Sequence, residues 1–402
     1  MRADVDVLVV GGGQAGLAVS HGLAASGVDH VVLEQDRVGS AWTRRWDSFR
    51  LVTPNHTIRL PGGEYRGAEP DGFLARDEVA GHLRGYAASF AAPVVEGTRV
   101  DALRADDGGF IAETSYGRIR ARRGVVCSGA YQRAHRPAFV AGFERELPVL
   151  PATEYRSPAS LPAGRVLVIG GGQTGCQLAE ELVHAGREVV LAASRAPAMP
   201  RRVAGRDTDD WLADAGFFEH TLADMPSPAV RFASTPLATG ANGGHDLDLR
   251  TLDAEGVQLI GHVLGTDDGA VVAADDLDDC VAVGDQAIRD ICAAIERTAA
   301  ALGLPEPELP EPPDSPPVAA PAPRLGDLAA DVVACGFRPA YGWIAIADLV
   351  DDMGFPLQED GASTRAPGLF FVGVPWMRTR KSPLLLGVGE DAGIVVDRLT
   401  TQ

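Results

Sequence analysis

The chain has 402 residues, of which 46% are hydrophobic and 23% charged, the balance of an ordinary globular protein with room for two or three domains. Its 36 basic and 55 acidic side chains give a formal net charge of −19, which repels phosphate backbones and acidic lipid headgroups. Nucleic acid and membranes are therefore not expected as partners. Any bound anionic dinucleotide must be held by local positive charge and backbone N–H groups.

The five cysteines are scattered and form no C-x-x-C pair. This pattern argues against a disulfide scaffold, a zinc site and the redox-active pair of disulfide reductases, and it fits a reducing cytoplasm. The apolar N-terminal segment runs directly into glycines, unlike a signal peptide, and no apolar run approaches the roughly 18 residues of a membrane span. We therefore expect a cytoplasmic protein with no metal site.

The first 35 residues predict a β-α-β unit. An apolar strand, Val5–Val10, is followed by the glycine turn Gly11–Gly16, a helix through Ala24 and a second strand, His30–Glu34. This order is typical of a dinucleotide-binding unit.

A second unit of the same kind begins about 160 residues later. The strand Val166–Ile169 leads into the turn Gly170–Gly175, a helix to His184 and a strand, Glu188–Ala192. The sequence thus predicts an α/β protein with two Rossmann-like dinucleotide-binding domains.

The rest of the chain predicts how these two units are joined. Strand-like pieces at 94–105, 109–114 and 118–127 suggest a small β-meander and return strand, and 304–323 is a Pro-, Glu- and Ala-rich linker. Short apolar strands at 331–335 and 368–372, with a helix over 389–399, suggest that the chain returns to complete the first domain. We predict a first domain from 1–162 and 326–402, with the second, 163–325, inserted into it.

Each glycine turn follows a strand and opens a helix, as dinucleotide binding requires. The first glycine permits the tight turn, the second lets the backbone approach a pyrophosphate, and the third allows close packing of helix on strand. The alternative is a tight turn without a ligand, which two complete copies in one chain make less attractive. The predicted contacts are Gly11, Gly13, Gln14, Ala15 and Gly16 in the first turn and Gly170, Gly172, Gln173, Thr174 and Gly175 in the second.

The residues after the second strand of each unit distinguish the two cofactors. Glu34, followed by Gln35, places a carboxylate where it can accept both ribose hydroxyls, which indicates FAD. In the second unit Ala193 stands at the matching position, with Ser194 and Arg195 next, and these groups suit the 2′-phosphate of NADPH. Two further arginines, Arg201 and Arg202, follow closely. The alternative for Arg195 is a solvated surface arginine.

Several motifs together resemble the flavin-containing monooxygenase superfamily, especially its short bacterial members. They are Gly11–Gly16 with Glu34, Gly39–Trp42 leading to Trp46–Leu51, Val126–Gly129, Gly170–Gly175, Ala334–Pro339 and Gly368–Trp376. The resemblance covers nearly the whole chain. It implies further cofactor contacts at Ser40, Trp42, Gly129, Gly336, Phe337, Gly373 and Trp376.

The resemblance also implies a chemistry. NADPH would reduce the flavin, and dioxygen would then form a flavin C4a-(hydro)peroxide that oxygenates a nitrogen or sulfur centre of a small organic molecule. The alternatives are an NADPH oxidase or reductase without oxygen transfer, a Baeyer–Villiger-type monooxygenase, or a non-catalytic flavin sensor. The oligomeric state stays open, a homodimer included.

Individual residues qualify this resemblance. Asn55 lies where related enzymes carry an asparagine near the oxygenated flavin, although a turn asparagine after Pro54 is the simpler alternative. Pro151 replaces the histidine of the Baeyer–Villiger signature, which weakens that alternative. Lys381 and Ser382 precede a helix start that could face the flavin.

Overall fold

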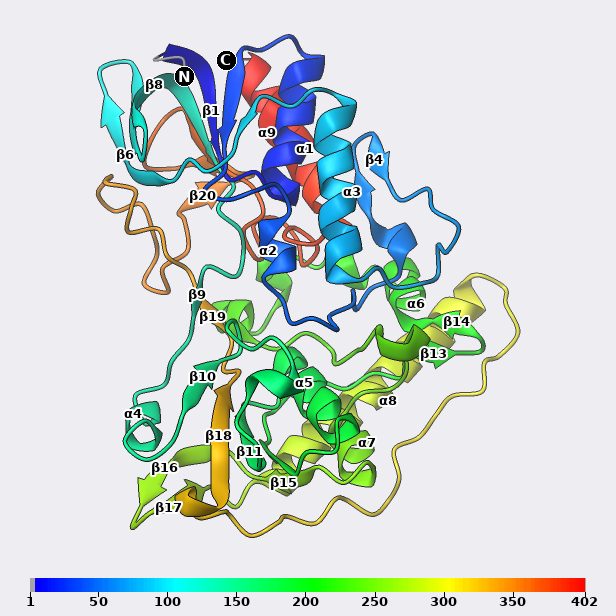
Figure 1. The fold of residues 1–402 in the computed structure, drawn as a ribbon. Coiled ribbons are helices and arrows are strands. Elements are labelled where there is room, and N and C mark those ends of the chain that lie inside the picture. The colour runs from blue at the N-terminus through cyan, green and yellow to red at the C-terminus, as the bar shows by residue number, and fades with distance from the viewer. Residues whose placement is uncertain (1–3, 402) are drawn as a thin grey trace.

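The computed structural model describes residues 4–401, which form two main sheets, one mixed and one parallel, each flanked by helices (Figure 1). The predicted α/β class with two Rossmann-like units is confirmed. Among the described residues, no helix is both long and apolar enough to cross a membrane.

The first sheet has the order β20-β21-β22-β8-β1-β2-β5, and β6 and β7 form a meander that joins it through β8. Its strands are β1 (Asp4–Val10), β2 (His30–Leu33), β5 (Val94–Val95), β6 (Val100–Asp106), β7 (Gly109–Thr114), β8 (Gly117–Val126), β20 (Gln358–Glu359), β21 (Ala362–Ser363) and β22 (Leu369–Phe371). Its helices are α1 (Gln14–Ala25), α2 (Ser40–Thr43), α3 (Arg76–Ser89) and α9 (Val388–Thr401). Figure 1 shows α1, α3 and α9 together beside this sheet.

The second sheet has the order β10-β18-β11-β12-β15, with all neighbours parallel. Its strands are β10 (Val149–Pro151), β11 (Arg165–Ile169), β12 (Val189–Ala192), β15 (Gln258–Ile260) and β18 (Leu328–Val333). Its helices are α4 (Val140–Phe143), α5 (Gln173–His184), α6 (Thr208–Asp214), α7 (Leu249–Ala254) and α8 (Leu277–Ala301). Two hairpins, β13 (Arg202–Val203) with β14 (Arg206–Asp207) and β16 (Val263–Asp267) with β17 (Ala270–Ala273), extend from it.

The strand predicted near 331–335 does not return to the first sheet. As β18 it lies between β10 and β11, with Asp331 opposite both Val149 and Leu167. The chain returns to the first sheet later, first through a bridge between Ile344 and Leu103 of β6 and then through β20–β22 and α9. The domain boundaries at 162/163 and 325/326 stay a prediction. The second sheet contains β10, which precedes the first boundary, and β18, which follows the second.

The Pro-rich segment 304–323 contains no helix or strand, and it crosses the outside of the second unit as a long strap (Figure 1). The Ala320 N–H donates to the Leu259 carbonyl at 2.8 Å, and Leu309 packs against a core cluster that includes Ile295 of α8. The strap is therefore anchored at both the sheet and the long helix.

Candidate cofactor and substrate site

Both glycine turns lie at the carboxyl ends of central strands, where open α/β sheets bind ligands. Gly11 and Gly170 have φ values of +108° and +112°, a region that favours glycine. A Cβ atom on Gly16 would lie 1.8 Å from the Gly11 carbonyl oxygen, and one on Gly175 would lie 1.7 Å from the Gly170 oxygen. The third glycine of each turn is thus required for the helix to pack on its strand.

The second glycine of each turn faces open space. Within the described part of the chain, a Cβ atom on Gly13 would meet nothing within 4 Å, and one on Gly172 would meet only the Ser234 side chain at 3.5 Å or more. Neither residue caps its helix through a side chain, so among residues 4–401 the first N–H groups of α1 and α5 have no side-chain cap at the N-cap position. This arrangement suits a pyrophosphate in both turns.

The side chains that follow β2 and β12 have matching contacts. Glu34 Oε2 accepts a hydrogen bond from the Gly12 N–H at 2.8 Å, and Ser194 Oγ accepts one from the Gly171 N–H at 2.8 Å. Ser194, rather than the buried Ala193, therefore takes the place of Glu34. The first unit carries a carboxylate at this point and the second a neutral hydroxyl.

Arg195 extends into solvent beside Ser194. Its side chain is 60% exposed, and Nη2 lies 3.3 Å from the Asp279 carboxylate, which is 70% exposed. An exposed pair of this kind is weak and can exchange partners. The 2′-phosphate role of Arg195 stays a prediction, with Asp279 as a competing partner.

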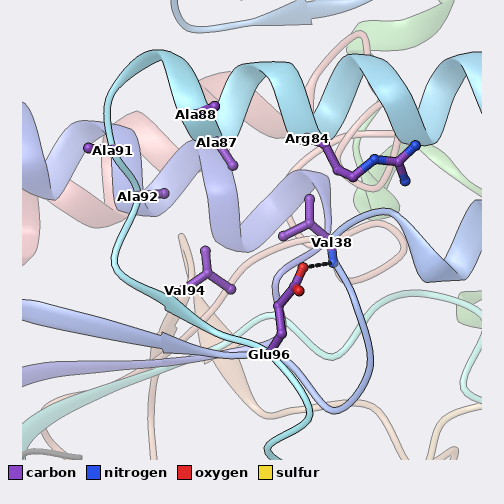
Figure 2. Close-up of a pocket in the computed structure, with 8 residues that line it drawn as sticks. All are labelled: Val38, Arg84, Ala87, Ala88, Ala91, Ala92, Val94 and Glu96. Atoms are coloured by element: carbon purple, nitrogen blue, oxygen red, sulfur yellow. Dashed lines mark hydrogen bonds between the residues drawn. The ribbon is translucent and has the colours of Figure 1, made fainter.

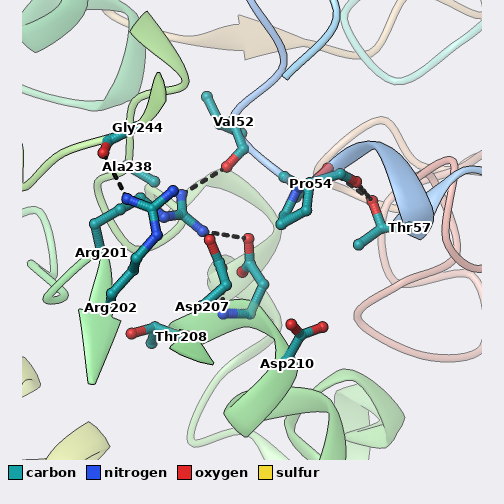
Figure 3. A network of polar contacts seen from close by, with 12 residues as sticks. Val52, Pro54, Thr57, Arg201, Arg202, Asp207, Thr208, Asp210, Ala238 and Gly244 are labelled. Atoms are coloured by element: carbon teal, nitrogen blue, oxygen red, sulfur yellow. Dashed lines mark hydrogen bonds and ion pairs between the residues drawn. The ribbon is translucent and has the colours of Figure 1, made fainter. Parts of the chain in front are cut away.

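Arg201 is not available to a 2′-phosphate. Its side chain is only 2% exposed and pairs with Asp207 and Asp209, and Nη1 donates to the Val52 carbonyl at 2.8 Å (Figure 3). Val52 belongs to the first unit, so this network joins the two units. Burial raises the pKa of Asp209 to about 6, against the pull of the adjacent guanidinium.

Arg202 is held differently, because its guanidinium donates to the carbonyls of Gly243 and Gly244. His245 follows these glycines, and its Nε2 lies 2.5 Å from the Glu180 carboxylate. This contact ties the loop after Gly244 to α5 and indicates a structural role for His245.

The side-chain amide of Asn55 is engaged at both ends. Nδ2 donates to the Glu69 carbonyl at 2.8 Å, and Oδ1 accepts from the Leu74 N–H at 2.7 Å. Asn55 is 1% exposed. These bonds fix the loop 69–74 and favour the turn interpretation; a catalytic role for Asn55 stays a prediction.

The loop 373–387 lies across the first glycine turn. A Cβ atom on Gly373 would come within 3.0 Å of the Ala15 Cβ, and Gln14 Nε2 donates to the Pro383 carbonyl at 2.8 Å. Gln173 has the matching position in α5 and accepts from the Ala238 N–H at 3.0 Å. Each fingerprint helix therefore holds a distant segment over its own turn.

Lys381 and Ser382 organise this loop. Lys381 Nζ lies 2.8 Å from Glu390 in α9 and 2.5 Å from Glu219, in the segment that follows α6. Ser382 Oγ accepts from the Arg378 and Thr379 N–H groups at 3.1 Å. Both side chains are thus engaged within the protein.

The other predicted cofactor contacts lie in segments that follow strands of the two sheets. Ser40 Oγ accepts from the Arg37 N–H at the start of α2, and Trp42 stacks against Phe49. Gly129, in the loop after β8, has a φ of +90°, and Phe337 in β19 (Phe337–Arg338) follows Gly336. No hydrogen bond of the Gln35 or Thr174 side chain is found among residues 4–401.

The sequence did not lead us to predict a functional role for Arg380. Its guanidinium lies between the rings of Phe217 and Trp376, with its carbon 4.0 Å and 4.6 Å from the ring centroids. The basic run 378–381 beside Trp376 could have drawn attention to it. The Phe217 partner, about 160 residues away, could not be found without the fold.

A surface hollow of about 410 Å³ beside the C-terminal end of α3 does not serve as the site (Figure 2). Its lining residues are Val38, Arg84, Ala87, Ala88, Ala91, Ala92, Val94 and Glu96. The Glu96 carboxylate accepts from the Val38 N–H at 2.8 Å, and no set of polar groups converges on the hollow (Figure 2).

His262, Asp276 and Cys280 place three potential metal ligands within 4.8 Å of one another. The separate segments that carry them explain why no metal motif is visible in the sequence. His262 Nδ1 and Asp276 form a 2.7 Å hydrogen bond, which accounts for this pair without an ion.

A family profile described as pyridine nucleotide-disulphide oxidoreductase matches residues 8–211, half of the chain. The match covers the first glycine turn, the second and the Arg201 network. The chain belongs to this family. All five cysteines of the chain are free, and four of them are buried. This member of the pyridine nucleotide-disulphide oxidoreductase family therefore has no cysteine pair.

Relatives of this pyridine nucleotide-disulphide oxidoreductase include proteins similar over their full length. An uncharacterized oxidoreductase, CzcO-like, of Geobacillus kaustophilus is 26% identical over 407 residues, covering 99% of each chain. A probable indole-3-pyruvate monooxygenase of Arabidopsis thaliana is 26% identical over 216 residues, half of each chain.

Solved structures share the fold. A flavin-containing monooxygenase from Stenotrophomonas maltophilia has a TM-score of 0.69 at 21% identity and covers 100% of this chain and 99% of its own. A bacillithiol disulfide reductase from Staphylococcus aureus has a TM-score of 0.63 at 12% identity, with 100% and 99% covered. Together with the family match, these likenesses confirm the resemblance to the flavin-containing monooxygenase superfamily and identify the chain as an oxidoreductase.

Proposed function

We propose that this oxidoreductase is an FAD- and NADPH-dependent monooxygenase that oxygenates a nitrogen or sulfur centre of a small organic molecule. The observation that carries the proposal is the difference between the two units at one matching position. Glu34 suits the ribose of FAD, whereas Ser194 and Arg195 suit the phosphorylated ribose of NADPH.

The first unit fits FAD. The open space at Gly13 and the uncapped first turn of α1 would receive the pyrophosphate, and Glu34 keeps acceptor capacity beside its bonds to the Gly12 and Asp36 N–H groups. The loop 373–387 is anchored on the same turn by Gln14. This loop would lie along the flavin.

The second unit fits NADPH by the same geometry. Gly172 and the first turn of α5 would receive its pyrophosphate, and Arg195 is exposed beside Ser194. These two sites would bring the cofactors together, and bound FAD would supply hydride acceptance from NADPH and activation of dioxygen. Two contacts join the units: Arg201 donates to the Val52 carbonyl, and Lys381 pairs with Glu219. Holding the units together in this way helps to keep water from the reacting atoms.

The names of several similar proteins support oxygen transfer. The Arabidopsis relative is a probable indole-3-pyruvate monooxygenase, and two structural neighbours are an S-allyl-L-cysteine S-oxygenase from Allium sativum and a steroid monooxygenase bound to NADP. These substrates belong to those proteins. For this chain they favour oxygenation as the reaction class and leave the substrate to experiment.

The test is a coupling measurement on the purified holoenzyme. NADPH oxidation, hydrogen peroxide release and product are measured with a panel of small thioethers and amines. We expect that at least one panel member lowers the peroxide released per NADPH and yields an equal amount of sulfoxide or N-oxide. Peroxide equal to NADPH oxidised with every panel member would instead identify an NADPH oxidase without oxygen transfer.

A further inference from the structure

Arg380 lies between the two points that anchor the loop 373–387 on the first glycine turn. Gly373 contacts Ala15 on one side of it, and Pro383 accepts the bond from Gln14 on the other. The Arg380 N–H donates to the His220 carbonyl at 2.9 Å. Arg380 therefore lies where the second unit meets the proposed flavin site.

The guanidinium of Arg380 has no carboxylate partner within 4.0 Å among residues 4–401. Other partly buried arginines do: Arg76 lies 2.8 Å from Asp47, and Arg250 lies 2.8 Å from Asp285. In that part of the chain the one hydrogen bond of the Arg380 side chain joins Nη2 to the Met225 sulfur at 3.6 Å. Nε is buried and has no partner.

The surroundings of Arg380 make this unpaired cation costly. Burial lowers its pKa to about 10, and the guanidinium carbon lies over the rings of both Phe217 and Trp376, 4.0 Å and 4.6 Å from their centroids. Stacking on aromatic rings stabilises a guanidinium less than a buried carboxylate partner would, and it leaves the edge of the group free for an anion. A charge taken from water in this way is ordinarily matched by an opposite charge.

Two other arginines are stacked on rings without a carboxylate partner among the described residues. Arg45 faces Phe49 and Tyr131, and Arg338 faces Phe232. Neither has a buried nitrogen without a hydrogen-bond partner, and neither lies on the loop over the first glycine turn. Arg380 alone among these three combines both features.

We propose that Arg380 binds a carboxylate of the substrate, so that the enzyme acts on small organic acids. The proposal rests on the proposed monooxygenase function, because only that function makes the bound acid a substrate. Phe217 and Trp376 hold the guanidinium in one orientation and exclude water from it, which strengthens the ion pair. Met225 and the two rings provide an apolar wall for the body of the acid.

Binding to the oxidised holoenzyme tests this proposal without turnover. The probes are 4-(methylthio)benzoate and 4-(methylthio)benzamide, together with the corresponding phenylacetate and phenylpropionate pairs, measured by titration calorimetry. We expect the wild type to bind at least one acid roughly tenfold or more tightly than its amide, as suits a charged hydrogen bond. Arg380→Met abolishes that preference, and Arg380→Lys keeps part of it.

Arg206→Met is the matched control. Arg206 also stacks on a ring, that of Trp211 at 4.6 Å, but it has its own carboxylate, Asp214. This variant keeps the preference for the acid, and a thermal melt of each variant checks its fold. Equal affinity of the wild type for acid and amide in every pair, absence of binding included, overturns the proposal.

A phosphate of NADPH has the same chemistry, so NADP⁺ binding is measured in parallel. Arg380→Met leaves the NADP⁺ affinity within about twofold of the wild type. A large loss of NADP⁺ affinity with an unchanged preference for acids assigns Arg380 to the cofactor and overturns the proposal. If acids bind through Arg380 but NADPH and dioxygen yield no oxygenated product, the proposed function fails and the anion site stands.

Discussion

Glu34 and Ser194 occupy the same place in the two nucleotide-binding units, since each accepts a 2.8 Å hydrogen bond from the backbone N–H of the middle residue of a glycine triplet. The two turns are otherwise closely alike, with φ values of +108° at Gly11 and +112° at Gly170. We therefore expect cofactor choice in the two units to depend on one carboxylate, that of Glu34, which is present in the first unit and missing from the second.

Glu34→Ala is expected to weaken FAD binding by roughly tenfold to a hundredfold, because a charged acceptor of two ribose hydroxyls is lost. Flavin fluorescence measured during titration of the apoprotein gives the affinity. Glu96→Ala is the control, because Glu96 is a nearby carboxylate that accepts a backbone N–H, that of Val38, outside the turn. Unchanged FAD affinity in Glu34→Ala would contradict the ribose role.

Arg195→Ala is expected to weaken NADP⁺ by about tenfold and NAD⁺ much less, because only the former carries a 2′-phosphate. Asp279→Asn removes the carboxylate that lies 3.3 Å from Arg195, so it should tighten NADP⁺ a few-fold. Equilibrium binding of both nucleotides checks the pair of variants. Equal losses for NADP⁺ and NAD⁺ in Arg195→Ala would remove this residue from the phosphate site.

Arg201→Ala is expected to lower the free energy of unfolding by about 3–5 kcal/mol, because Asp207 and Asp209 would be left as buried carboxylates without a cation. Denaturant unfolding of the purified protein measures the change. Asp207→Asn with Asp209→Asn in the same chain should restore part of the loss. A variant as stable as the wild type would show that the network does not join the units as described.

The contrast between Arg195 and Arg201 shows where sequence reasoning ends. Both follow β12 within ten residues, and both looked suited to a phosphate. One is 60% exposed and the other 2%, because Asp207, Asp209 and Val52 surround only the second. Those partners come from other segments, and long-range placement of this kind is not contained in a local pattern.

The glycine turns were predictable for the opposite reason. A strand, three spaced glycines and a helix are contiguous, so their geometry follows from local sterics alone. The strand at 331–335 was predicted as a strand, but its sheet was not. Its apolar residues would suit either parallel sheet, and the choice depends on pairing with β10 and β11.

Asp331 predicts how stability depends on pH. Its side chain is fully buried in β18, neither carboxylate oxygen has a hydrogen-bond partner among the described residues, and burial raises its pKa from 3.8 to about 7. The folded state therefore favours the protonated form. Its contribution is fully present below the unfolded pKa and is lost as the pH rises through about 7, in total roughly 4 kcal/mol.

Asp331→Asn removes the ionisation and is expected to make the free energy of unfolding less dependent on pH between about 4 and 7. The variant should exceed the wild type in stability by a margin that grows as the pH rises and levels off near pH 8. Urea unfolding across this range measures it. A wild type and variant with parallel pH profiles would show that Asp331 does not titrate in this way.

The proposed monooxygenase function requires that oxygen from dioxygen enters the substrate. The holoenzyme is incubated with NADPH, isotope-labelled dioxygen and the best-coupled small thioether or amine of the panel, and the product is analysed by mass spectrometry. We expect one labelled oxygen atom in each product molecule, with the label absent when labelled water replaces labelled dioxygen. Consumption of NADPH with all the label recovered as hydrogen peroxide, and none in any organic product, would contradict it.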